Sequence, residues 1–190
     1  MRDIEKTTRD ERFIEWLESV RDADDPGARG TLAALRRGLG QRPGNAIEMY
    51  PYIVPFLTEK DSYWTEQCIF TIASLFAMHL QPGGEGTMGS VMSQVAQKTR
   101  SDSVEKRFIA LLDSTREELP GRLRHAVSLA KSKEVAIDWR RLLRDIRGWN
   151  EYELWVQRKW ARDYWGRSHA TSEDEETKDA MEKEVAISEG

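Results

Sequence analysis

Apolar residues recur along the chain at the spacing of amphipathic α-helices. The first set stands at i, i+3, i+4 and i+7, which places its members on one helix face: Phe13, Trp16, Leu17 and Val20. Nowhere do four or more residues alternate cleanly between apolar and polar types between turn signals, the pattern that would predict a half-buried strand. The chain is therefore expected to be all-α.

Proline and glycine divide the first half of the chain. Pro26 predicts the first turn of a second helix, because the fixed φ angle of proline suits that position. The segment Gly40–Asn45 is expected to end this helix. Pro51 and Pro55 then divide the apolar stretch Ile47–Leu57 into short helical pieces.

A long apolar helix is predicted at Tyr63–Leu80, with Asp61 or Ser62 as its N-cap. The segment Gln81–Gly89 that follows is the clearest interruption in the chain, because it is rich in glycine. We place a boundary there, which predicts two packed helical bundles, at residues 1–84 and 85–168.

The second half repeats the helical pattern. Ser103 and Asp138 are each expected to cap a helix. A further helix between them is indicated by four apolar residues at helical spacing: Leu119, Leu123, Val127 and Ala130. The last predicted helix covers residues 151–166 and contains four aromatic side chains: Trp155, Trp160, Tyr164 and Trp165.

The formal net charge of −4 conceals a strong asymmetry. Residues 172–190 contain eight acidic residues and two lysines, a charge of −6, and no aromatic residue. This composition predicts that the acidic segment, residues 169–190, is disordered. The rest of the chain is basic, and residues 122–167 alone carry +6. A basic C-terminal half followed by an acidic tail suggests a polyanionic partner.

Several classes of protein are disfavoured by composition. No run approaches the ~18 apolar residues that a membrane span needs. The N-terminal segment lacks the apolar core of a secretory signal, and Cys68 is the only cysteine, so neither secretion nor a disulfide framework is expected. These patterns favour a cytoplasmic protein with no membrane partner.

Catalytic patterns have little support in the sequence. The three histidines, His79, His125 and His169, are far apart, and none has a second ligand at helical spacing. Gly84–Gly89 spells G-x-G-x-x-G, but an apolar helix precedes it where a dinucleotide site needs a strand, so an inter-helix loop is favoured. We expect no cofactor, no metal site and no enzymatic activity.

Arginines gather on several predicted helix faces. On a helical wheel begun at Trp139, Arg140, Arg144 and Arg147 form a stripe beside the apolar face, while Asp145 falls on the other side. Arginine suits phosphate because its planar guanidinium donates two parallel hydrogen bonds. The alternative is a set of solvated helix faces with i, i+4 ion pairs.

Five segments, in order, resemble the CasB family, the small subunit of the type I-E CRISPR surveillance complex Cascade. The first resembles an R-x-x-L-R-R-G motif and the last ends in W-A-R-D-Y-W; the five are Arg29–Gly38, Ser103–Leu112, Glu118–Arg124, Ile137–Trp149 and Val156–Trp165. The resemblance covers roughly residues 10–166. The acidic tail has no counterpart in this pattern.

The resemblance implies an all-helical, non-enzymatic subunit that acts in antiviral defence. Two copies would line the inside of the complex, contacting its other subunits, guide RNA and target DNA, and would help to hold the displaced strand of the R-loop. Matching the motifs gives six candidate contacts with nucleic acid: Arg29, Arg36, Arg37, Arg107, Arg122 and Arg124. The helical wheel adds Arg140 and Arg144.

Two other functions remain open from the residues. One is a protein-interaction module whose basic faces meet acidic partners. The other is a small helical DNA-binding regulator, although the candidate helices lack base-reading Asn or Gln at their starts. The sequence preference and the salt dependence of nucleic-acid binding would separate the three.

Overall fold

The computed structural model describes residues 8–99, 101–150 and 152–166, and within these ranges every regular element is a helix. The all-α prediction is confirmed for this part of the chain, whereas the predicted disordered tail lies outside it. The elements are α1 (Arg9–Asp22), α2 (Pro26–Arg36), η1 (Ile47–Met49), α3 (Tyr50–Ile53), η2 (Val54–Phe56), α4 (Tyr63–Met78), α5 (Met88–Thr99), α6 (Ser103–Leu112), α7 (Leu119–Ser132), α8 (Trp139–Arg147), η3 (Tyr152–Leu154) and a final helix over residues 155–166.

Polar side chains at the helix starts explain several of these boundaries. Thr8 and Glu11 form a reciprocal capping box on α1, and Asp25 accepts a hydrogen bond from the Ala28 amide at 2.8 Å ahead of Pro26. Ser62, not Asp61, caps α4 by accepting from the Thr65 amide at 3.1 Å. The expected helix starts at Pro26 and at residue 63 are therefore confirmed.

Three predicted boundaries were wrong. The final helix starts at residue 155, after η3, and not at residue 151. Ser103 is the first residue of α6, and Asp102 occupies the N-cap without a side-chain hydrogen bond to the helix. The long apolar helix α4 ends at Met78, two residues before the predicted end, and His79 takes an extended conformation. The buried ring of His79 explains this ending, because Nε2 lies 2.8 Å from the carbonyl oxygen of Val135 in another segment.

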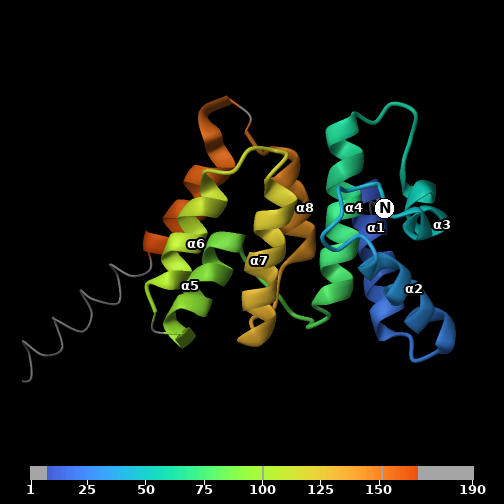
Figure 1. The fold of residues 1–190 in the computed structure, drawn as a ribbon, viewed down its shortest axis with the longest axis horizontal. Helices are drawn as coiled ribbons and strands as arrows, with labels where there is room; N and C mark the ends of the chain where they lie inside the picture. The colour runs from blue at the N-terminus through green and yellow to red at the C-terminus, as the bar shows by residue number, and fades with distance from the viewer. Residues whose placement is uncertain (1–7, 100, 151, 167–190) are drawn as a thin grey trace, which may run out of the picture.

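The helices form two groups around one continuous core (Figure 1). Helices α1 to α4 lie on one side, and α5 to α8 with the final helix lie on the other, with α4 and α8 packed against each other between them. Phe76 of α4 and Trp139 of α8 contact each other with ring centroids 5.5 Å apart. A single cluster of buried side chains runs through both groups. A shared core does not test whether the chain divides near residue 84, so the division into residues 1–84 and 85–168 stays a prediction.

The glycines of the G-x-G-x-x-G segment allow backbones to approach closely. A Cβ on Gly84 would lie 2.0 Å from the carbonyl carbon of Ile137, and one on Gly89 would lie 2.0 Å from the Trp160 carbonyl oxygen. Gly86 has φ +84°, a conformation that suits glycine. Residues 84–87 lie in the connection between α4 and α5, so the predicted inter-helix loop is confirmed for them, whereas Met88 and Gly89 already belong to α5.

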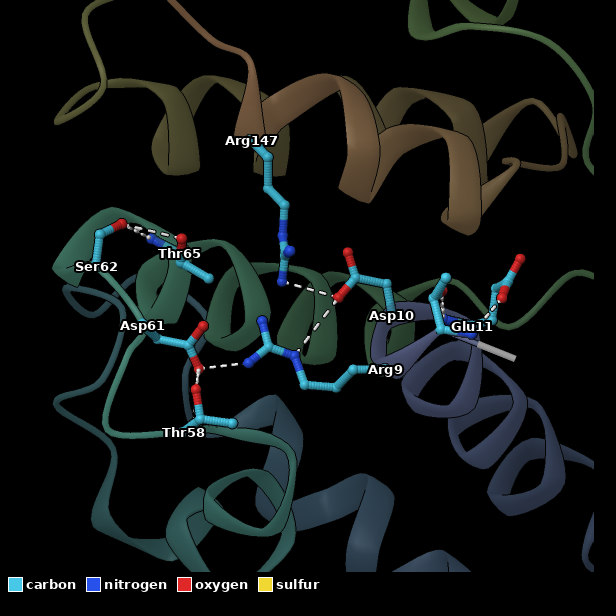
Figure 2. Close-up of polar contacts among 9 residues, drawn as sticks. Arg9, Asp10, Glu11, Thr58, Asp61, Ser62, Thr65 and Arg147 are labelled. Atoms are coloured by element: carbon cyan, nitrogen blue, oxygen red, sulfur yellow. Dashed lines mark hydrogen bonds and ion pairs between the residues drawn. The ribbon is translucent and has the colours of Figure 1, made fainter. Parts of the chain in front are cut away.

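A charged cluster joins α1, α8 and the loop before α4 (Figure 2). Asp10 lies between two arginines, at 2.9 Å from Arg147 and 3.8 Å from Arg9, and Arg9 also donates a hydrogen bond to Asp61. That hydrogen bond is the main reason why the pKa of Asp61 lies below its ordinary value. The cluster therefore ties the two groups of helices together beside the shared core.

Asp145 corrects the helical-wheel picture of α8. The wheel assigned this carboxylate to a side away from the basic stripe, whereas in the structure it is fully buried. It accepts hydrogen bonds from Arg141 at 2.8 Å and from the Trp160 indole at 2.7 Å. The wheel considers one helix alone, and the final helix covers that side of α8.

Candidate nucleic-acid interface

All eight arginines singled out from the sequence are exposed. The structure does not bring them into one patch. They lie on three regions: α2 and its C-cap (Arg29, Arg36 and Arg37), the α6 and α7 surface (Arg107, Arg122 and Arg124) and α8 (Arg140 and Arg144). Each region has a different relation to the neighbouring acidic and polar groups.

Two of the predicted residues meet at a groove between α6 and α7. Its cationic rim is formed by Lys106 and Arg107 of α6 and by Arg122 of α7, and its volume is about 550 Å³. The other lining residues are Met92, Ala110, His125, Ala126, Ser128 and Leu129. We call this set the α6–α7 groove. No carboxylate lines it, and the charged side chains of its rim are all basic.

The pattern of α7 explains the positive side of this groove. Leu119, Leu123 and Val127 are buried at i, i+4 and i+8, which turns Arg122 and His125 outward. Between Leu119 and Ser132 the helix has no Asp or Glu. The one acid of α6, Glu105, accepts a hydrogen bond from the Trp165 indole at 3.2 Å and does not line the groove.

Arg124 lines a second, smaller hollow of about 130 Å³. Its guanidinium lies over the loop after α2, and a Cβ on Gly40 would fall 2.7 Å from Nη1. His125 lines both hollows. Arg122 and Arg124 belong to one motif but line different hollows, because residues two apart on a helix do not face the same way.

The arginines of α2 and its C-cap differ in their partners. Arg36 donates a hydrogen bond from Nε to the Ala77 carbonyl at 2.7 Å, and so satisfies an acceptor in the last turn of α4. Arg37 is exposed at the C-cap of α2. Arg29 forms only a long contact with Asp24 at 3.7 Å, and both side chains are highly exposed. Arg36 therefore has a structural role that the sequence did not reveal.

The basic stripe on α8 lies against acidic residues of α1. Arg140 contacts Glu15 at 3.3 Å and Glu18 at 3.6 Å, and Arg147 contacts Asp10. Arg144 is exposed and has no ion pair within the described part of the chain. The expected separation of this stripe from acids is therefore wrong, since the acids come from another helix.

Lys106 and His125 complete the groove but were not among the sequence-predicted site residues. Lys106 stands next to Arg107, and His125 stands three residues after Arg122, so it lies on the same face of α7. These spacings are the sequence signal that could have identified both residues as members of the site. What the sequence could not show was that α6 and α7 lie side by side.

The single cysteine of the chain lies in the core. The thiol of Cys68 is buried, and burial raises its pKa to about 12, which disfavours the nucleophilic thiolate. Within the described ranges, no three His, Cys, Asp or Glu side chains gather as metal ligands would. In the same part of the chain no helix has the length and apolar character needed to cross a bilayer.

Comparison with known proteins settles the family. The sequence profile of the CRISPR-associated protein Cse2 family matches residues 31–165. The chain belongs to the Cse2 family. Cse2 of Thermus thermophilus is 36% identical over 174 residues, which cover 89% of this chain and 96% of the relative. The sequence resemblance to CasB is thereby confirmed, since solved CasB structures match the same chain.

Two solved CasB structures share the fold of this Cse2-family chain. CasB from Thermus thermophilus has a TM-score of 0.72 at 35% identity, covering 83% of this chain and 97% of its own. M. ruber CasB has a TM-score of 0.71 at 32% identity, covering 89% and 98%. A chain of a CRISPR RNA-guided surveillance complex, 20% identical with a TM-score of 0.71 over 87% and 96%, has the same fold.

Proposed function

We propose that this Cse2-family chain is a non-catalytic subunit of a CRISPR RNA-guided surveillance complex and that its α6–α7 groove binds nucleic acid. The observation that carries the proposal is the groove itself, where Lys106, Arg107 and Arg122 converge with no carboxylate among the lining residues. Membership of the Cse2 family supports the assignment to such a complex. Guide RNA, target DNA, other subunits and a second copy of the chain are the proposed partners.

The chemistry of the groove favours the sugar-phosphate backbone over the bases. Arginine donates paired hydrogen bonds to phosphate oxygens, and a lysine ammonium adds a compact positive charge. No Asn, Gln, Asp or Glu lines the groove, and these are the side chains that commonly read the edges of adenine and cytosine. Binding should therefore depend on salt and not on nucleotide sequence.

Such binding would act on the displaced strand of an R-loop. R-loop formation is a nearly balanced exchange, because the RNA–DNA hybrid is about as stable as the duplex that it replaces. A few phosphate contacts to the displaced strand can therefore shift the equilibrium. The other exposed arginines, Arg29, Arg37, Arg124 and Arg144, are proposed to extend this contact, whereas Arg36 and Arg140 already have partners within the chain.

The test is a double variant in the groove, Arg107→Ala with Arg122→Ala. Affinity for unrelated single-stranded DNA and RNA sequences should fall alike, and each lost phosphate contact should flatten the log–log salt dependence by about 0.7 on single strands. Fluorescence anisotropy at several salt concentrations measures both. In an assembled complex the same variant should shorten the lifetime of the R-loop.

Matched controls separate local binding from net charge and folding. Arg12→Ala with Lys60→Ala removes the same charge from exposed positions outside the groove and should leave affinity nearly unchanged. The groove variant should keep its melting temperature, while Trp139→Ala, which removes a buried side chain, should lower stability by ~3–5 kcal/mol. Equal affinity loss in both double variants, or none in either, would contradict the groove assignment.

An exposed apolar surface favours a second role, in protein contact. Ile47, Tyr50, Val54 and Tyr63 are large hydrophobic residues that remain between 43% and 72% exposed around α3. Such surfaces commonly meet other proteins. In a complex subunit this role is compatible with the nucleic-acid groove.

A DNA-binding regulator would instead show strong preference for one nucleotide sequence in the same anisotropy experiment.

A further inference from the structure

The C-terminal acidic segment, residues 172–190, lies beyond the match to the Cse2 family, which ends at residue 165. It carries a formal charge of −6, while the rest of the chain is net basic. We propose that this segment binds the α6–α7 groove of its own chain and competes there with nucleic acid. The competition rests on the proposed function, whereas the contact between tail and groove does not.

The end of the final helix brings the segment close to the groove. Trp165 contacts α6 in two ways, through its hydrogen bond to Glu105 at 3.2 Å and through the Phe108 ring at a centroid distance of 5.5 Å. The same short helix, drawn beside the red end of the final helix in Figure 1, supplies Lys106 and Arg107 to the groove. The tail therefore starts beside an element that forms the groove's cationic rim.

The chain after the final helix is long enough to reach the groove. Residues 167–171 precede the acidic segment and can span at most about 17 Å when fully extended. A helix with its side chains is about 10–12 Å across, so a path around half of it is about 16–19 Å, which the connection covers together with the first residues of the acidic segment. A short tether also gives the segment an effective concentration of the order of millimolar at the groove, without any partner.

Charge complementarity selects the α6–α7 groove as the docking surface. The segment offers eight carboxylates, and the groove offers Lys106, Arg107 and Arg122 with no acid in its lining. Carboxylate and phosphate accept the same paired hydrogen bonds from arginine. On α8, by contrast, the Glu15 and Glu18 carboxylates of α1 already neutralise Arg140. The residues that line the groove therefore include no competing acid, while Glu118 interacts with Arg122 from outside the lining.

The contact itself is tested without nucleic acid, by comparing backbone amide NMR spectra of two chains. One is the full chain, and the other has all eight acids of the segment changed to the matching amides, such as Glu173→Gln and Asp174→Asn. Amide shifts should differ around Lys106, Arg107 and Arg122 and should not change on dilution. The Arg107→Ala, Arg122→Ala variant should abolish the difference. A difference confined to other surfaces, no difference, or one that disappears on dilution and so indicates a second copy would overturn the proposal.

The competition is tested by the affinity for single-stranded DNA. If the tail occupies the groove for two thirds to nine tenths of the time, neutralising or deleting it should tighten apparent binding about three- to tenfold. The gain should shrink as salt rises, because screening weakens the contact. Deleting residues 171–190 should leave the melting temperature nearly unchanged, since the segment contributes few apolar groups.

The outcomes distinguish this proposal from the proposed function. Tail-dependent amide shifts with no nucleic-acid binding by any variant would contradict the nucleic-acid function and the competition, while leaving the intramolecular contact established. Nucleic-acid binding that is weakened by the Arg107→Ala, Arg122→Ala variant but unaffected by the tail would support the function and overturn the tail proposal.

Discussion

Asp145 connects α8 to the final helix through one buried carboxylate. It accepts hydrogen bonds from Arg141 on its own helix and from Trp160 on the final helix, and Trp160 also packs against Trp149 with ring centroids 5.0 Å apart. The sequence supports the i, i+4 relation of Arg141 and Asp145. It could not show that a tryptophan 15 residues later would bury the pair, because that depends on how the final helix returns.

Replacing this carboxylate should be strongly destabilising. Asp145→Ala leaves the Trp160 indole and the Arg141 guanidinium without their acceptor, and loss of one partner of a buried pair typically costs about 3–5 kcal/mol. Chemical denaturation measures the change. Asp113→Ala, at an exposed position, is the matched control and should stay within about 0.5 kcal/mol of the parent chain. A similar small effect for both would show that Asp145 is not a structural centre.

Asp61 should make stability depend on acid pH. The hydrogen bond from Arg9 and two from Thr58 hold its pKa below the ordinary carboxyl value, so the folded state binds its proton less readily than the unfolded state. The ionised Asp61 carboxylate stabilises the folded state fully at pH values above about 3.9, its pKa in the unfolded chain. This stabilisation is lost as the pH falls through the lower pKa of the folded chain. Asp61→Asn should therefore destabilise by roughly 1.5–3 kcal/mol at pH 7.

The difference in the free energy of unfolding between Asp61→Asn and the parent chain should shrink as the pH falls through the pKa of Asp61 in the folded chain. Urea unfolding at a series of pH values measures it. Asp24→Asn, whose carboxylate is almost fully exposed, should change stability little at any of them. A constant difference for Asp61→Asn down to strong acid would mean that its effect comes from shape and not from charge.

At the scale of elements, periodicity predicted most helices because each buries one apolar face. The breaks at Pro26, Pro51 and Pro55 were also foreseeable, since proline restricts the backbone locally. Caps were less predictable where several polar residues adjoin, as at Ser103, because any of them can supply the oxygen. The end of α4 depended on His79 meeting Val135, a contact between segments that no local pattern contains.

Two helical glycines should respond oppositely to the same substitution. Gly89→Ala would force a Cβ against the Trp160 carbonyl oxygen and should lower stability by about 1–3 kcal/mol or more through overpacking. Gly30→Ala places its methyl group in open space within α2 and should be neutral or stabilising by up to ~1 kcal/mol, because alanine favours helix. Thermal melting of both variants measures this contrast. Equal changes would contradict the close approach of α5 to the final helix.

At the scale of the whole molecule, the packing of helices determines which side chains become neighbours, and the sequence alone does not show this. The groove joins Arg107 and Arg122, which lie in separate motifs, and it exists because α6 and α7 lie side by side. The exposure of the eight arginines followed from helical patterning, whereas the acidic partners of Arg140 and Arg147 come from α1. Sequence reasoning predicted the kind of side chain and its exposure, but not its neighbours.

The shared core should make the described helices unfold together. The α4–α8 contact, the Phe76–Trp139 pair and the Asp10–Arg147 ion pair all cross between the two groups of helices. Differential scanning calorimetry should show one transition, with equal calorimetric and van't Hoff enthalpies. Residues 1–84 expressed alone should lack a cooperative melt, since α4 would lose the α8 surface that covers it. Two separate transitions in the full chain would instead support independent bundles.

The burial of Cys68 has a practical consequence, because the chain contains no other cysteine. At neutral pH the buried thiol, with its raised pKa, is shielded from alkylating reagents while the protein is folded. Modification must then wait for α4 to open, so its rate reports the equilibrium between closed and open forms. The rate of Cys68 alkylation in the native chain thus measures opening at a single site. Nucleic acid or partner subunits that hold the fold closed should lower this rate.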